Sequence, residues 1–313
     1  MRLTLDSFVL EQPIGEGGMG EVWRGEHRQT GVDVAVKVIR SRRGEEARGR
    51  FRREVQAHAG LTHPGIVYLF EYGTISPDAR AASDGRLRAG DPYVAMELAD
   101  RGTVADLMPI DDWPTVRSLL RQVLDALAFS HARDVIHRDL KPENFLLFDA
   151  ADRPAGLRLK LADFGIAHAF DDIAARKTGD LTAAQGTPSY MAPEQCHGRW
   201  RAYGPWTDLY ALGCIAWELV CGRPPLQANS PFALMVKHET ADRPRLAPRF
   251  PVPDGLEAWI RRAMAVDPRQ RFQRAADAAD ALPTRPEPST TAATAPDDRP
   301  ATGHDLTTLI ETR

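Results

Sequence analysis

Residues 137–144 read HRDLKPEN and residues 163–165 read DFG, and these two stretches are the most informative feature of the chain. They supply two aspartates, an asparagine, a lysine and an arginine within a short length of sequence. Transfer of a phosphoryl group needs metal ions that bridge the phosphates, cations against the developing charge, and a carboxylate that orients the attacking hydroxyl. The sequence therefore predicts a phosphoryl-transfer site.

The bulk composition is that of an ordinary globular protein. The chain has 313 residues, of which 43% are hydrophobic and 27% charged, with a formal net charge of −3. This charge predicts no general attraction to nucleic acid or to an anionic membrane. The three cysteines form no CxxC pair, the N-terminus lacks the apolar core of a signal peptide, and the most apolar run, 209–221, is too short to span a bilayer. We expect a cytoplasmic protein without membrane insertion or a nucleic-acid partner.

The first hundred residues show the alternation and the turn residues of a small sheet. Short apolar runs in 8–39, broken by glycines, predict three strands, and two more are expected near 66–72 and 93–98. Helical spacing of Phe51 and Val55 predicts one helix over 45–60. A stretch rich in Gly, Asp and Arg, 76–91, is expected to be a flexible loop.

The sequence after residue 100 favours helices. Apolar residues from Val116 to Ala128 follow the i, i+3, i+4, i+7 spacing of a core-facing helix, and a more deeply buried helix is predicted over Asp208–Val220. Further helices are expected near 231–238, 256–265 and 274–281. Residues 283–313 are rich in Pro, Thr and Ala and predict a disordered tail. The fold class is therefore α+β, with an antiparallel sheet and one helix followed by a mainly helical part.

The segment 14–22, IGEGGMGEV, has glycines where a backbone can bend sharply and approach phosphates closely. A lone GxGxxG is a weak signal, because dinucleotide-binding folds use one between a strand and a helix. Here predicted strands flank it on both sides, which favours a glycine-rich flap over nucleotide phosphates. The alternative is a plain hairpin turn.

Lys37 interrupts an otherwise apolar predicted strand. Because a lysine is rarely buried without a partner, it needs an anion nearby. Glu54, on the helix that follows, is the expected partner, with nucleotide phosphates as the second. The alternative is a surface lysine whose stem lies along the strand.

From about residue 8 to 282 the chain resembles a Hanks-type (eukaryotic-like) serine/threonine protein kinase of the bacterial branch. Besides the two stretches quoted first, the resemblance is carried by GTPSYMAPE at 186–194, TDLYALG at 207–213 and DPRQR at 267–271. It implies a bilobal fold, with an N-lobe over 8–97 and a C-lobe over 100–282. It also implies transfer of the γ-phosphoryl of ATP to Ser or Thr hydroxyls of proteins.

The resemblance assigns roles to the polar residues. Asp139 would orient the substrate hydroxyl, Lys141 would hold the transferred phosphate, and Thr187 would contact both. Asn144 and Asp163 would hold Mg²⁺, with Mn²⁺ as a substitute ion. Glu194 would pair with Arg271, while Asp208 would brace the backbone of the catalytic loop.

The resemblance also assigns the nucleotide site. Met96, Glu97 and Leu98 would lie at the hinge between the lobes. The full set of residues implied to bind ATP is Ile14, Gly15, Glu16, Gly17, Gly18, Met19, Gly20, Val22, Ala35, Lys37, Met96, Glu97, Leu98 and Leu146.

Regulation is suggested by a few further residues. Arg138 is a cation on which a phosphorylated segment could dock, and Thr178 or Thr182 would be the acceptor. Autophosphorylation in trans would pass through a transient homodimer. Threonines of the tail are further candidate sites, and the arginines of 40–53 are either a solvated face or a docking patch for acidic sequences.

Two other functions fit the same motifs. A pseudokinase would serve as a scaffold, but Lys37, Asp139 and Asp163 are all intact. A small-molecule phosphotransferase shares the two-lobed core but usually lacks the APE segment found here. Two insertions depart from the family pattern: the 76–91 loop, and residues 149–156 between two predicted strands. The substrates, the upstream signal and the oligomeric state stay open.

Overall fold

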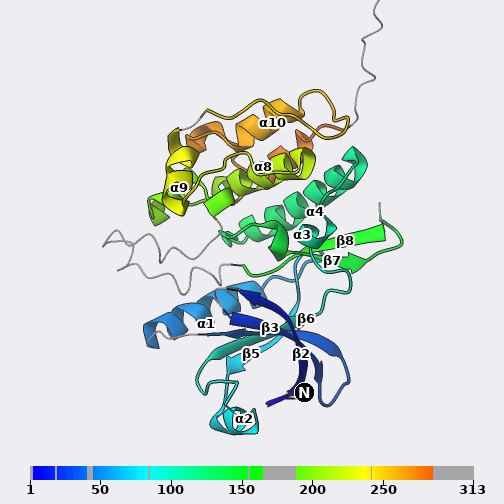
Figure 1. The fold of residues 1–313 in the computed structure, drawn as a ribbon, viewed down its shortest axis with the longest axis vertical. Coiled ribbons are helices and arrows are strands. Elements are labelled where there is room, and N and C mark those ends of the chain that lie inside the picture. Colours follow the sequence, from blue (N-terminus) through cyan, green and yellow to red (C-terminus); the bar gives the residue numbers. More distant parts are fainter. Residues whose placement is uncertain are drawn as a thin grey trace, which may run out of the picture.

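The computed structural model describes residues 3–17, 20–40, 45–83, 85–153, 156–164, 188–240 and 242–284. They form two lobes, a sheet with one long helix at the N-terminal end and a larger group of helices after it (Figure 1). The predicted α+β, bilobal fold is confirmed.

The N-lobe is built on one antiparallel sheet of six strands in the order β1-β2-β3-β4-β6-β5. Helix α1 (Glu45–Ala59) lies against this sheet, and its Phe51 and Val55 are buried in one cluster with Ile39 and Val94. Phe51 and Val55, four residues apart, therefore lie on the same buried face of α1. The strands are β1 (Leu3–Leu5), β2 (Phe8–Gly17), β3 (Gly20–His27), β4 (Asp33–Ile39), β5 (Leu69–Thr74) and β6 (Pro92–Glu97).

The expectation of a flexible loop over 76–91 is wrong for the described residues of that stretch. It contains helix α2 (Pro77–Ala82), whose first turn is capped by Ser76, because the Ser76 Oγ accepts a hydrogen bond from Ala79 N at 3.1 Å. Ala79 and Leu87 are buried in the same cluster as Leu5 of β1. A helix of six residues is too short to show helical periodicity in sequence, so only its packing reveals it.

The C-lobe is mainly helical and surrounds one large apolar core. Helix α4 (Trp113–His131) is capped at its start by Asp112, whose Oδ1 accepts from Thr115 N at 2.8 Å, and it packs against α8 (Pro205–Cys221). The other helices are α3 (Val104–Leu107), α7 (Pro193–Cys196), α9 (Pro231–Thr240), α10 (Leu256–Ala263) and α11 (Ala275–Asp280). Short 3₁₀ helices are η1 (Pro142–Asn144), η4 (Pro188–Tyr190), η5 (Trp200–Ala202) and η6 (Pro268–Gln270). None of the helices described has the length and apolar content needed to cross a membrane.

A two-stranded hairpin between the lobes brings the two diagnostic stretches together. Strand β7 (Phe145–Asp149) pairs antiparallel with β8 (Leu157–Leu161), so the residues before β7 and after β8 lie side by side. Ala162 N donates to Asn144 O at 3.0 Å, which closes this end of the hairpin. Asn144 and Asp163 are neighbours for this reason, although the sequence separates them by the whole hairpin.

Candidate functional site

A cleft of about 1110 Å³ lies between the lobes and is lined by residues of both. Most residues predicted to act on a nucleotide are in its wall. They are Ile14, Gly15, Glu16, Gly17, Gly20, Val22, Ala35, Lys37, Met96, Leu98, Asp139, Lys141, Asn144, Leu146 and Asp163. Gly18 and Met19 lie outside the described residues.

Glu97 is an exception, because it does not line the cleft. Its Oε1 accepts a hydrogen bond from Tyr68 N at 3.1 Å, and its Oε2 pairs with Lys160 of β8. The carboxylate therefore joins the predicted hinge to the residue before β5 and to β8, and the part of Glu97 in ATP binding stays a prediction.

The glycine-rich turn of β2 and β3 forms one rim of the cleft. Gly17 and Gly20 are cross-strand partners where the hairpin turns. Gly20 has a φ of +148°, and a Cβ placed there would lie 1.9 Å from Val38 O, so a side chain has no room. Arg40 pairs with Glu16 at 3.2 Å and with Glu21, and so links the end of β4 to both arms of the hairpin.

An apolar slot lies deeper in the cleft. Ala35 and Met96 from the N-lobe sheet and Ala162 from the C-lobe are buried in one cluster. Leu98 and Leu146, both partly buried, pack against it. Aliphatic side chains from both lobes thus offer the two faces that a planar ring such as adenine needs.

The catalytic-loop residues converge at the polar end of the cleft. Lys141 Nζ lies 3.2 Å from Asp139 Oδ2, and Asn144 Nδ2 donates to Asp139 O at 2.8 Å. Burial alone would lower the pKa of Lys141, but the nearby carboxylate of Asp139 outweighs it and raises the pKa. Lys141 is therefore a permanent cation beside Asp139.

Asp163 faces the same end of the cleft. Its Oδ2 lies 2.5 Å from Lys37 Nζ, and its backbone has a positive φ of 64°. Burial would raise the pKa of this carboxyl, but the ammonium groups of Lys37 and Lys141 lower it. Asp163 is thus ionised at neutral pH. The oxygens of its carboxylate and of the Asn144 amide are the hard donors that Mg²⁺ prefers, so these residues fit a magnesium site.

The expected Lys37–Glu54 ion pair is wrong for this structure. The described partner of Lys37 is Asp163, whereas Glu54 Oε1 of α1 accepts from Arg138 Nη1 at 3.2 Å. Glu54 does not line the cleft. Which carboxylate meets Lys37 depends on how α1 packs, and local sequence cannot predict this.

Asp208 braces the backbone of the catalytic loop at His137 and Arg138, as predicted. Its Oδ2 accepts from His137 N at 2.8 Å and its Oδ1 accepts from Arg138 N at 2.7 Å. His131 Nε2, at the end of α4, lies 2.8 Å from the same Oδ2. No motif in the sequence pointed to His131, because its role depends on the packing of α4 against α8.

Phe164, next to Asp163, packs between two buried imidazole rings. The ring centroids lie 4.5 Å apart for His137 and 5.1 Å apart for His58, which belongs to α1. His58 Nε2 is 3.1 Å from Val67 O. Desolvation lowers the pKa of His58 to about 4. The imidazole that joins α1 to Phe164 is therefore neutral at physiological pH.

We expect this buried imidazole to make the protein less stable in mild acid. The pKa of His58 is about 4 in the folded state, below its ordinary 6.5, so the unfolded chain binds the extra proton between these values. The contribution of His58 to the free energy of unfolding is fully present above pH 6.5. It falls by about 3 kcal/mol as the pH is lowered to 4. Urea unfolding measured from pH 7.5 to pH 4.5 should show a shallower pH slope for His58→Leu than for wild type. Equal slopes would contradict a folded-state pKa far below 6.5.

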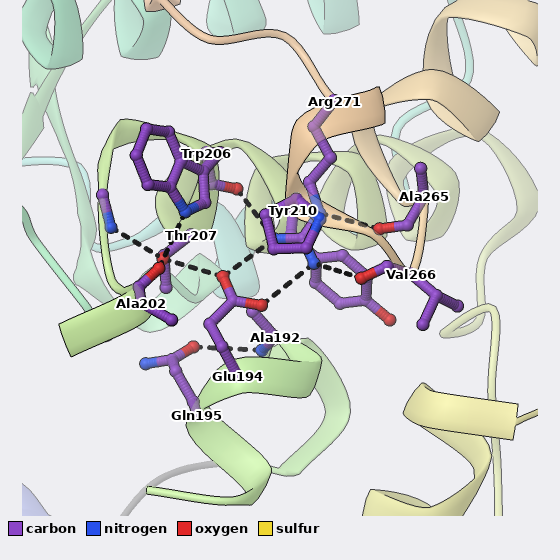
Figure 2. Close-up of polar contacts among 12 residues, drawn as sticks. Ala192, Glu194, Gln195, Ala202, Trp206, Thr207, Tyr210, Ala265, Val266 and Arg271 are labelled. Carbon is purple, nitrogen blue, oxygen red and sulfur yellow. Dashed lines mark hydrogen bonds and ion pairs between the residues drawn. The ribbon is translucent and has the colours of Figure 1, made fainter. Parts of the chain in front are cut away.

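The predicted pair of Glu194 with Arg271 is formed deep in the C-lobe (Figure 2). Arg271 Nη1 and Nη2 donate to the two carboxylate oxygens of Glu194 at 2.9 and 3.0 Å. The remaining donors of Arg271 bond to the carbonyls of Trp206, Ala265 and Val266. Thr207 Oγ1 donates to Glu194 Oε1 at 2.8 Å, so the carboxylate is fixed from both α8 and the segment before α11.

Several residues predicted to act in catalysis or in regulation lie outside the described residues. These are Thr178, Thr182 and Thr187, together with the tail threonines Thr307, Thr308 and Thr312. Their roles stay predictions.

The sequence is similar to known proteins over most of its length. The family model "Protein kinase domain" matches residues 8–281. The serine/threonine-protein kinase PknF of Mycobacterium tuberculosis is 34% identical over 289 residues, which cover 89% of this chain and 56% of that protein. PknB of Mycobacterium tuberculosis is 34% identical over 278 residues, 87% of this chain and 42% of the relative. The chain thus spans about half the length of these curated relatives.

A solved structure agrees with the sequence comparisons. The kinase domain of Mycobacterium tuberculosis PknI matches with a TM-score of 0.62 and 27% identity, covering 89% of this chain and 96% of that one. The family model covers both lobes and the cleft between them. The chain therefore belongs to the protein kinase family, and its relatives are bacterial serine/threonine kinases.

Proposed function

We propose that this protein transfers the γ-phosphoryl group of ATP to serine or threonine hydroxyls of protein substrates. The observation that carries the proposal is the convergence of Asp139, Lys141, Asn144, Asp163 and Lys37 at one end of a cleft whose other end is apolar. Such a cleft has a place for a planar base, a place for phosphates and a carboxylate beside the place where a hydroxyl would arrive.

In this proposal the nucleotide lies under the glycine-rich hairpin, with its phosphates towards Lys37. The ammonium of Lys37 exchanges its contact with Asp163 for the α and β phosphates. Asp139 accepts a hydrogen bond from the substrate hydroxyl and aligns its oxygen with the γ-phosphorus. Lys141, held 3.2 Å from Asp139, stabilises the negative charge that develops on the transferred group.

Asn144 and Asp163 would hold the metal ion, for which we propose Mg²⁺, with Mn²⁺ as a substitute. When bound, the metal ion supplies positive charge to the β and γ phosphates. The contact between Asn144 Nδ2 and Asp139 O leaves the amide oxygen as the end of this side chain suited to bind it.

The proposed specificity for serine and threonine as phosphate acceptors rests on Lys141 after HRDL, on the glycine and threonine before the APE segment, and on the names of the relatives.

We further propose autophosphorylation at Thr178 or Thr182 through a transient homodimer. The cytoplasmic location expected from the sequence stays a prediction.

Replacement of Asp139 tests the proposed function most directly. Asp139→Asn keeps the size of the side chain but removes the charge that orients the hydroxyl, so we expect kcat to fall about 10²- to 10⁴-fold. The measurement is transfer of labelled phosphate from ATP with Mg²⁺ to a generic basic protein, followed by mass-spectrometric mapping. Asp152→Asn, in the exposed turn of the β7–β8 hairpin, is the control and should keep wild-type turnover.

Other outcomes would point to the competing functions. Binding of ATP without transfer by wild type to any protein, itself included, would favour a pseudokinase scaffold. Transfer to small hydroxyl compounds but not to proteins would favour a small-molecule phosphotransferase. Label on serine or threonine that disappears in Asp139→Asn would support a protein kinase.

A further inference from the structure

The peptide unit that joins Arg138 to Asp139 is held in an unusual conformation. Arg138 has a φ of +68°, in the left-handed region that residues with a side chain rarely adopt. Such a conformation costs about 1–2 kcal/mol and persists only where the surroundings impose it. Because Asp139 follows directly, the orientation of this peptide sets the direction in which its carboxylate points.

Three side chains hold this part of the backbone. Asp208 Oδ1 accepts from Arg138 N at 2.7 Å, and His137 Nδ1 lies 3.4 Å from Asp139 N. The carbonyl oxygen of Arg138 accepts a hydrogen bond from Gln195 Nε2 at 2.8 Å. The hydrogen bond from Gln195 therefore holds the carbonyl of the Arg138–Asp139 peptide and opposes rotation of this peptide plane.

The amide oxygen of Gln195 also forms a hydrogen bond. Its Oε1 accepts from Ala192 N at 3.0 Å, in the APE segment before α7 (Figure 2). One contact requires an acceptor and the other a donor, so only this orientation of the amide satisfies both. The side chain is buried, with 7% of its surface exposed, so water cannot readily replace either bond.

We propose that Gln195 is a positioning residue for phosphoryl transfer, because it locks the Arg138–Asp139 peptide against the APE segment. This inference rests on the proposed function and adds to it a residue that does not line the cleft. Loss of the Nε2 donor removes this hydrogen bond from the Arg138 carbonyl and allows the peptide plane to turn. Asp139 is then displaced from the line of attack, although the nucleotide site is intact.

The competing explanation is that Gln195 contributes only to stability. The chain offers a matched control in Gln122 of α4, which is 9% exposed. Its Oε1 accepts from Leu159 N at 2.9 Å and its Nε2 reaches Leu157 O at 3.5 Å, so it too joins two backbone groups through one buried amide. Gln122 braces β8 and makes no contact with the catalytic loop among the bonds described.

The experiment compares Gln195→Met with Gln122→Met in steady-state kinetics on ATP and a basic protein substrate. We expect Gln195→Met to lower kcat about 10- to 100-fold while the KM for ATP stays within about twofold of wild type. Gln122→Met should keep kcat within about twofold of wild type. A kcat of Gln195→Met equal to that of Gln122→Met would overturn the proposal.

A second variant guards against a failure to fold. Gln195→Glu keeps the acceptor for Ala192 N but presents an oxygen instead of a donor to the Arg138 carbonyl, so kcat should fall as much as in Gln195→Met. Fluorescent-nucleotide binding reports whether each variant is folded. If Gln195→Glu binds nucleotide and keeps wild-type kcat, the proposal is wrong even if Gln195→Met does not fold. Absence of transfer by wild type would instead refute the proposed function.

Discussion

Replacement of Asp163 by alanine is expected to lower kcat/KM for phosphoryl transfer by about 10³-fold or more. This carboxylate is ionised, lies at the polar end of the cleft and fits a metal ion together with Asn144. Alanine removes the charge that would hold the metal at the phosphates. Initial rates with labelled ATP over a range of Mg²⁺ concentrations measure the effect, and raising Mg²⁺ should not restore wild-type turnover.

The same substitution removes the anionic partner of Lys37, which lies 2.5 Å away. Urea unfolding should therefore accompany the kinetics, so that a loss of folded protein is not taken for a loss of catalysis. Asp149→Ala, at the exposed end of β7, is the matched aspartate control and should be as active as wild type. If Asp163→Ala keeps more than about a tenth of wild-type turnover, the role assigned to Asp163 is wrong.

The largest effect on stability is expected at the buried pair of Arg271 and Glu194. Both side chains are almost completely buried, and the guanidinium donates hydrogen bonds to this carboxylate and to backbone carbonyls while its central carbon lies 4.7 Å from the centroid of the Tyr210 ring. Arg271→Met leaves the carboxylate of Glu194 buried without its cation, which costs about 3–5 kcal/mol. Urea unfolding at pH 7.5 measures the loss.

A double-mutant cycle separates the pair from its surroundings. Glu194→Leu combined with Arg271→Met should be less destabilised than the sum of the two single variants, because neither charge is left alone. Arg249→Met breaks the exposed pair with Asp111 and should leave the free energy of unfolding nearly unchanged. Strict additivity of the two buried substitutions would show that their charges do not interact.

The sequence predicted most of the architecture because its signals are local. Phe51 and Val55 lie on the buried face of α1, and the apolar spacing from Val116 to Ala128 falls within α4. The pair of Glu194 with Arg271 and the bracing by Asp208 were also predicted, but from the resemblance to kinases and not from spacing. Helix α2 and strand β1 were missed, since such short elements are stabilised by the surface they cover.

The sequence by itself determined which residues are available for the chemistry and in which elements they lie. Only the tertiary structure decided how they are paired. Lys37 contacts Asp163 while Glu54 contacts Arg138, because the position of α1 sets which opposite charge is nearest. The side chain of Glu97 turns to Lys160, away from the cleft, and Gln195 reaches the Arg138 carbonyl across two segments far apart in sequence. Ion pairs and hydrogen bonds depend on distances of a few ångströms, which are set by how helices and strands pack and not by the order of residues along the chain.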